Sequence, residues 1–469
     1  MSTHNAVTMK GASALPLLVF LGGLAFLWFG GSRPAPANPR LASQTAENAP
    51  VASLPFEYFR KHIFVTVQIN DSGPHTCMVD NGSNAVIIAD RVARDIGVKT
   101  YPTVGKNQNF KGLGEGTGPK TFFADDGIAF RAEGSPILTG TIIVLDMEAL
   151  EKALGRPLDC ITGSRLFLNF VVKVDFEKRG LTLYEPGGFV YSGQGRTVQL
   201  RLAAPPTIQT EVLTADGRTV KAIVGLDLGG DSIIDFHPSF QLKHHILQAQ
   251  QPEVVNGATG LAGEFRERTA RLPSVDVGGF KIEKPLVGFI DTPLDPGLSS
   301  RKTDGFVGNA LLERFTVIFD YSRRQVTFEP NASIGDPFTA NLTGIGADPN
   351  SDPVRGFEVK SREEGSVAAI AGLKLGDRIV EINGVLCSTL TFESFHQMLT
   401  AEGAPFKLKV ERGGEKIEIS FQTPRLPKVQ VKLAYFSSMR FGLCRGRVRN
   451  LLSKECRKYA GAFQKAEVC

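Results

Sequence analysis

The chain has 469 residues, which is enough for two or three domains with hydrophobic cores of ordinary size. Its 42% hydrophobic and 22% charged residues exclude both a polytopic membrane protein and a wholly disordered chain. The net charge of +5 arises from residues 428–469, which hold ten Lys or Arg and two Asp or Glu. We therefore expect no basic face on a folded domain and no nucleic-acid partner. The 50 Gly, 27 Pro and 32 Phe favour short strands joined by turns.

An uncharged apolar run occupies residues 14–30, after Lys10 and before a stretch rich in Pro and Ala. Such a run is typical of an export signal or a membrane anchor, and Ala35-Pro36-Ala37 fits a cleavage site without deciding between the two. We expect residues 1–30 to be this signal or anchor and residues 31–50 to be a flexible linker. The body would then be exported, in the periplasm or elsewhere outside the cytoplasm, and either secreted or held at the membrane by the apolar run.

Residues 60–330 contain an internal repeat. In each half, an Asp-x-x-x-Gly turn precedes a Leu, a Phe, an apolar-Asp-aromatic triplet and a short alternating strand. The turn spans residues 159–163 in the first half and 304–308 in the second, and the corresponding positions lie 145 residues apart. Upstream, an apolar strand ends in Asp80-Asn-Gly-Ser in the first half and in Asp227-Leu-Gly-Gly in the second. Two unrelated β domains would not share this order of signals.

Each half is therefore expected to form one lobe of short strands, the first over residues 51–190 and the second over residues 191–331. Two such lobes should pack about a pseudo-twofold axis, which would bring the two Asp turns together. Two carboxylates about 3 Å apart cannot both ionise cheaply, so one serves as acid and the other as base on a shared water. Glycine-rich hairpins would close over this cleft as flaps. The flap candidates are Gly112, Gly114, Gly116, Gly257 and Gly260.

These motifs resemble those of the retropepsin-like or pepsin-like aspartic protease family, in the single-chain, two-lobed form of its bacterial members. The resemblance covers more than half of the chain and places the two Asp turns where the family has Asp-Thr-Gly. It implies a mostly β fold, a catalytic dyad of Asp80 and Asp227, and peptide-bond hydrolysis by an activated water without a metal or another cofactor. The active-site turns would contain Asn81, Gly82 and Ser83 in the first lobe and Leu228, Gly229 and Gly230 in the second.

Neither turn has the Thr whose hydroxyl, in that family, bonds across to the opposite turn. Asn81 supplies a polar group at this position, whereas Leu228 does not. Two hypotheses therefore remain for the lobes: a working endopeptidase, and an inactive scaffold that binds peptides. Cys77 and Cys160 lie beside the predicted turns, and we expect small core residues rather than a disulfide, although an exported location would permit one.

After a linker expected at residues 331–354, a different unit begins. Its string Ala371-Gly-Leu-Lys-Leu-Gly-Asp-Arg-Ile-Val-Glu-Ile-Asn-Gly, with a helix at 392–400 and strands at 406–411 and 416–421, resembles a PDZ domain over residues 355–424. The resemblance implies capture of peptide or protein C-termini, with the peptide adding as a strand beside residues 357–361. The residues expected to contact it are Arg355, Gly356, Phe357, Val359 and Met398.

Residues 425–469 continue no such pattern and are expected to form a basic tail. The six Cys show no spacing with one another or with His that would hold zinc, so no metal is expected. The sequence thus predicts an exported aspartic endopeptidase, tethered to the membrane or secreted, whose PDZ domain captures protein termini. The alternatives are the peptide-binding scaffold and an assembly factor that uses only its PDZ domain.

Overall fold

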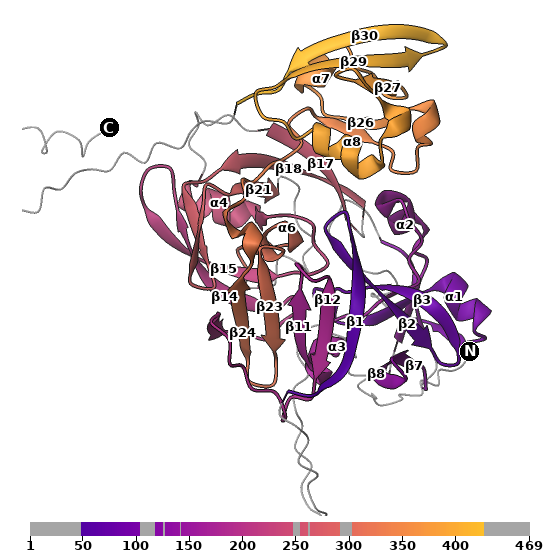
Figure 1. The fold of residues 1–469 in the computed structure, drawn as a ribbon, viewed down its shortest axis with the longest axis vertical. Helices are drawn as coiled ribbons and strands as arrows, with labels where there is room; N and C mark the ends of the chain where they lie inside the picture. The colour runs from indigo at the N-terminus through magenta and orange to yellow at the C-terminus, as the bar shows by residue number, and fades with distance from the viewer. Residues whose placement is uncertain are drawn as a thin grey trace, which may run out of the picture. The chain divides into compact units, whose positions relative to one another are not determined.

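The computed structural model describes residues 48–103, 118–124, 127–140, 142–246, 254–260, 263–290 and 303–425. The apolar run at 14–30, the basic tail, and Gly112, Gly114 and Gly116 of the first glycine-rich segment lie outside the described residues. Among the residues that the structure describes, no helix has the length and apolar character needed to span a bilayer. The described chain is mostly β, as the composition predicts (Figure 1).

The first half forms a sheet with the strand order β1-β2-β3-β10-β4-β9-β6-β5, and β7 pairs with β2 and β8. The strands are β1 (Pro50–Phe59), β2 (His62–Ile69), β3 (Ser72–Met78), β4 (Val86–Ala89), β5 (Thr100–Pro102), β6 (Thr121–Ala124), β7 (Ala129–Ala132), β8 (Ser135–Thr139), β9 (Ile142–Leu145), β10 (Cys160–Ile161), β11 (Val171–Asp175) and β12 (Gly180–Tyr184). The helices are α1 (Asp90–Asp95), α2 (Glu148–Leu154) and α3 (Arg165–Asn169).

The second half forms a sheet with the order β17-β18-β21-β16-β22-β15-β14-β19-β20. The strands of this half are β13 (Arg196–Gln199), β14 (Thr207–Leu213), β15 (Thr219–Leu226), β16 (Ile234–Phe236), β17 (Val254–Gly260), β18 (Gly263–Arg271), β19 (Ser274–Val277), β20 (Phe280–Glu283), β21 (Leu286–Ile290), β22 (Gly305–Val307), β23 (Phe315–Asp320) and β24 (Gln325–Pro330). Of these, β13, β23 and β24 belong to the sheet of the first half. The helices are α4 (Pro238–His244) and α6 (Asn309–Leu312), and the 3-10 turn η1 (Ala332–Gly335) follows.

The two sheets repeat one another strand by strand. The order β2-β3-β10-β4-β9-β6 in the first half corresponds to β14-β15-β22-β16-β21-β18 in the second. Orientations also correspond: β3 with β10 and β15 with β22 are parallel, and so are β4 with β9 and β16 with β21. The sequence repeat is therefore a duplicated lobe, and it puts the turns after β3 and β15 in equivalent places.

An antiparallel pair of β11 with β23 joins the lobes. Its register is symmetric about the pair Lys173 and Ile318, which are equivalent positions of the repeat. Each lobe thus presents the same face to the other, as at a twofold interface. Strands β24, β23, β11, β12 and β1 lie side by side in one sheet (Figure 1). The paired residues are Val172 with Phe319, Lys173 with Ile318, Val174 with Val317, and Asp175 with Thr316.

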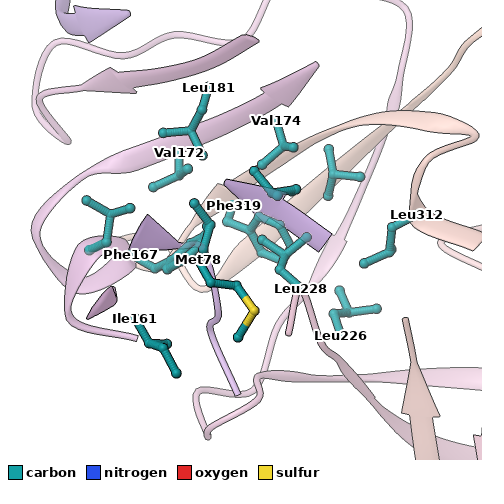
Figure 2. Packing of buried hydrophobic residues seen from close by; sticks show 14 of the residues in the cluster. Met78, Ile161, Phe167, Val172, Val174, Leu181, Leu226, Leu228, Leu312 and Phe319 are labelled. Atoms are coloured by element: carbon teal, nitrogen blue, oxygen red, sulfur yellow. The ribbon is translucent and has the colours of Figure 1, made fainter. Parts of the chain in front are cut away.

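One hydrophobic core extends through both lobes, since residues of both halves belong to a single buried cluster. Alternating apolar positions on strands such as β1 and β12 turn one face of the sheet inward, as the period of a strand requires. Figure 2 shows Leu228 of the second lobe among side chains that include Met78 and Phe319. Shared burial of this kind fixes the lobes against each other beneath the two Asp turns.

Cys77 and Cys160 form a disulfide, so the expectation of two unbonded core residues is wrong. Both are fully buried, as core residues would be, but they are also direct partners in the parallel pair of β3 with β10. Their equivalents in the second lobe, Val224 and Gly305, occupy the same register without a bridge. The sequence could not reveal this bond, because it depends on the register of a strand only two residues long.

The C-terminal unit has its own core and a sheet with the order β25-β26-β27-β29-β30, in which β28 also pairs with β27. The strands are β25 (Ile345–Ala347), β26 (Phe357–Arg362), β27 (Arg378–Ile382), β28 (Val385–Leu386), β29 (Pro405–Arg412) and β30 (Glu415–Gln422). The remaining elements are η2 (Pro353–Arg355), α7 (Val367–Ile370), η3 (Cys387–Thr389) and α8 (Phe392–Met398). The segment expected to be a linker at 331–354 therefore supplies β25 to this sheet.

Asp235 in β16 should make folding sensitive to pH. Desolvation raises the pKa of its carboxyl from 3.8 to about 7, the nearby Asp231 adds to the rise, and the Ser232 hydroxyl opposes it. Between pH 3.8 and about 7, the Asp235 carboxyl is ionised in the unfolded chain and protonated in the folded chain. The free energy of unfolding therefore falls as pH rises through this window. Asp235→Asn should unfold at a higher temperature than wild type at pH 7.5, with little difference at pH 4. The same difference in melting temperature between Asp235→Asn and wild type at both pH values would contradict this assignment.

Candidate active site

The structure brings Asp80 and Asp227 together at the centre of the duplicated lobes. A Cβ built on Gly82 would lie 2.7 Å from Asp227 Oδ1, and one built on Gly229 would lie 2.6 Å from Asp80 Oδ1. Each carboxylate therefore rests against the glycine of the opposite turn. Only glycine permits this approach, because any side chain would occupy the space of the facing carboxylate.

Each carboxylate is held by backbone N–H groups of its own turn. Asp80 Oδ1 accepts from the N–H of Gly82 at 2.6 Å and of Ser83 at 3.2 Å. Asp227 Oδ1 accepts from the N–H of Gly229 at 2.9 Å. Asp80 is 8% exposed, so its orientation is set by these bonds rather than by solvent. The result is a rigid pair of acidic groups at the end of two buried strands.

The Asp-x-x-x-Gly turns lock the strands that carry the two acids. Asp159 Oδ2 accepts from the N–H of Thr76, and Asp304 Oδ2 accepts from the N–H of Ile223, both at 2.8 Å. A Cβ at Gly163 would lie 2.2 Å from Ala85 O, and one at Gly308 would lie 2.6 Å from Ser232 O. These acidic residues are therefore structural, and the glycines allow each turn to cross directly behind an Asp turn.

Asn81 connects the two Asp turns. Its Oδ1 accepts from the N–H of Leu228 at 2.9 Å, and its Nδ2 donates to Tyr321 Oη at 3.5 Å. The reverse bond is missing because Leu228 has no polar group, and its fully buried side chain joins the shared core instead. Asn309 partly replaces it, since Asn309 Nδ2 donates to Leu228 O and to Lys61 O, each at 2.7 Å. The turns are thus joined by an asymmetric network rather than by two equivalent hydroxyls.

Tyr321 and Asn309 are site residues that the sequence reasoning missed. Burial raises the pKa of the Tyr321 hydroxyl far above its usual range, and the charges of Asp227 and Asp80 raise it further. Tyr321 therefore remains protonated beside the two acids. A signal for Asn309 was present: it occupies the repeat position of Ser164, yet it differs in type. Each of the two residues donates its backbone N–H to the Asp80 or Asp227 turn of its own lobe, Ser164 to Ser83 O and Asn309 to Gly230 O.

The glycine-rich segment of the second lobe forms a hairpin. Strands β17 and β18 pair in antiparallel register, with Gly257 opposite Arg266 and Gly260 opposite Gly263. The backbone therefore has the hairpin form expected of a flap. No group of three or more His, Cys, Asp or Glu within the described ranges is arranged to hold a metal ion.

The PDZ contact residues predicted from sequence need correction. Strand β26 is paired on both edges, with β25 through Val359, Ser361 and Arg362 and with β27 through Phe357 and Glu358, so no peptide can add there.

The predicted contact residues have other roles. Phe357 and Val359 are core residues, at 0% and 1% exposure, and Met398 packs on the same core. Gly356 serves a turn, with a φ of +88° and a Cβ position 2.7 Å from Ile379 O. Arg355 is exposed at the end of η2.

Comparison with known proteins supports part of this description. Residues 358–412 match the PDZ domain family, so this part of the chain is a PDZ domain. The chain is also similar to a crystal structure of an aspartic proteinase from Irpex lacteus, with 13% identity over 61% of this chain and 98% of that chain, and a TM-score of 0.36. None of the curated proteins matches the chain in sequence. The interpretation of the two lobes therefore depends on their own geometry.

Removing the Asn81 amide should loosen the paired turns. Asn81→Ala leaves the buried N–H of Leu228 without its acceptor, at an expected cost of about 1–3 kcal/mol in the free energy of unfolding. Asn81→Thr, whose hydroxyl can accept the same bond, should recover part of this loss. Thermal unfolding of the two variants and wild type measures the effect. Equal midpoints for Asn81→Ala and wild type would show that this bond does not hold the turns.

Proposed function

We propose that the chain is an exported aspartic endopeptidase and that its PDZ domain binds the C-termini of peptides or proteins. The observation that carries the enzymatic part is the reciprocal placement of Asp80 and Asp227, each against the glycine of the opposite turn. Such a pair supplies an acid and a base within one small site.

The reaction proposed for this pair is direct hydrolysis. The ionised carboxylate takes a proton from a water, whose oxygen attacks the carbonyl carbon of the peptide, while the protonated carboxyl donates its proton to the carbonyl oxygen. In the collapse, one hydroxyl of the tetrahedral intermediate gives its proton to the newly ionised carboxylate, the other carboxyl protonates the amine nitrogen, and the C–N bond breaks. The pair is then left with one proton, as at the start. No covalent bond to the protein forms. The backbone N–H groups of Gly82, Ser83 and Gly229 favour the ionised form of whichever carboxylate acts as base.

Export is supported by the apolar run at residues 14–30 and by the bond between Cys77 and Cys160, because disulfides persist in oxidising compartments. The same run is proposed to be the membrane contact if it is not removed. In the PDZ domain, the peptide is proposed to add at β25, which has a neighbour in β26 on one side only.

An inactive peptide-binding scaffold is the second candidate. Leu228 favours it, because an apolar residue at this position cannot return the side-chain bond that Asn81 makes to the N–H of Leu228. The test is to incubate the purified protein with a mixed peptide library across a pH series and to read the products by mass spectrometry. New peptide termini at any pH support the enzyme, whereas an intact library with a well-folded protein supports the scaffold.

A further inference from the structure

Strand β25 is the outermost strand of the PDZ sheet beside β26, and its register decides which of its backbone groups face away from β26. The N–H of Glu363 donates to Gly344 O at 3.0 Å, which makes these two residues a hydrogen-bonded pair of the antiparallel ladder. Hydrogen-bonded and non-bonded pairs alternate along such a ladder. Ile345, opposite Arg362, is therefore in a non-bonded pair, and its N–H and C=O point away from β26.

Both outward groups of Ile345 already have partners. The N–H of Ile345 donates to Thr343 Oγ1 at 3.2 Å, and Asn341 Nδ2 donates to Ile345 O at 2.8 Å. Asn341 Oδ1 in turn accepts from the Thr343 hydroxyl at 2.6 Å and from the Thr343 N–H at 3.0 Å. The three residues thus form a closed ring of hydrogen bonds. Thr343 is fully buried and Ile345 is 2% exposed, so the ring belongs to the packed domain.

The loop backbone beneath this ring is fixed. Gly344 has a φ of +74°, and a Cβ at this position would lie 2.3 Å from Ser366 Cβ at the start of α7. Because the backbone is held against Ser366, the Ile345 edge can be exposed only by rotation of the Asn341 and Thr343 side chains.

We propose that Asn341 and Thr343 are an internal cap on the peptide-binding edge, which restricts it to partners that end in a free carboxylate. This inference deepens the peptide binding proposed for the PDZ domain and rests on it. An added strand needs the N–H and C=O of Ile345 that the cap occupies. An internal segment would exchange neutral hydrogen bonds for neutral ones and gain little. A terminal carboxylate on the Ile345 N–H makes a charge-assisted bond, which is about twice as strong, and so displaces the Thr343 hydroxyl.

The test compares two pools of short fluorescent peptides that share randomised last residues and end in either a free carboxylate or an amide. Binding is measured by anisotropy on the full chain carrying Asp80→Asn, so that the probes stay intact. This chain is the parent for the variants below.

Asn341→Ala removes the cap from the Ile345 edge. The variant should bind the amide pool about three- to tenfold more tightly than the parent, with a smaller preference for the acid pool. Thr343→Val, which keeps the side-chain volume, should act in the same direction. Asn350→Ala is the matched control, because Asn350 bonds Asp348 and Lys152 O and not the Ile345 edge.

The possible results separate the cap from the binding function. Tighter amide binding by both cap variants, and not by the control, supports the cap. If both folded variants bind the amide pool no better than the parent while the parent binds the acid pool, the cap is overturned and peptide binding stands. If neither the parent nor either variant binds any pool, the peptide-binding function itself is overturned, and the cap with it.

Discussion

Replacing either Asp80 or Asp227 by Asn is expected to lower kcat/KM for peptide cleavage at least about a thousandfold, with the fold intact. The amide has the shape of the carboxyl group but can neither accept the proton of water at neutral pH nor serve as an acid. Each variant removes one member of a pair that acts as a unit, so the double variant should be scarcely worse than either single one. Cleavage products read by mass spectrometry measure the loss.

Asp175→Asn is the control for this pair of variants. Asp175 starts a closing hairpin, where its Oδ1 accepts from the N–H of Lys178, so its loss should leave cleavage unchanged. Retention of cleavage in Asp80→Asn or in Asp227→Asn would exclude the shared site. Loss in all three variants would point to a general effect on folding instead.

Adding one methyl group at Gly229 is expected to abolish most of the activity. The new Cβ would lie 2.5 Å from Asp80 Cγ, closer than atoms in real proteins approach, so either the carboxylate or the turn must move. A displacement of about 1 Å at reacting groups can cost about a hundredfold in rate, and we expect Gly229→Ala to lose at least this much. Gly82→Ala should behave in the same way, because its Cβ would meet Asp227 Oδ1.

Gly230→Ala is the matched control for the methyl group. The atoms nearest to a Cβ at Gly230 are 3.7 Å away, and its equivalent in the first lobe, Ser83, already carries a side chain. The control should therefore retain cleavage within a fewfold of wild type. Comparable losses in Gly229→Ala and Gly230→Ala would contradict the close approach of the two turns. Activity and melting temperature are measured together, so that a displaced carboxylate is distinguished from an unfolded lobe.

The duplicated lobe was predictable from the sequence because a repeat leaves its order of signals in the chain. Offsets of 145 and 147 residues located both Asp turns and the Asp-x-x-x-Gly turns, and the strand orders of the two sheets are equivalent. What escaped prediction depends on register and on side chains that meet across the lobes. The Asn309 bond to Lys61 O, for example, joins the second lobe to the first across 248 residues of sequence.

The PDZ domain shows the same limit. Its string of Gly, Asp and Asn turns indicated the domain correctly, since these residues mark tight turns at fixed offsets. The string did not reveal which strand lies at the edge of the sheet, because edge position is set by pairing between distant segments. Strand β25 is only three residues long and precedes the recognisable pattern, so the sequence alone does not separate it from the linker.

The shared carboxylate site is tested most directly by the pH dependence of kcat/KM for one peptide that the wild-type protein cleaves. Two carboxylates that share a site lose their protons in two separated macroscopic steps, and only the singly protonated pair has both an acid and a base. A paired site should give a bell-shaped profile, with activity falling on both the acidic and the alkaline side. A profile that rises through a single ionisation and stays level at higher pH would mean that one carboxylate acts alone, and would contradict the paired site.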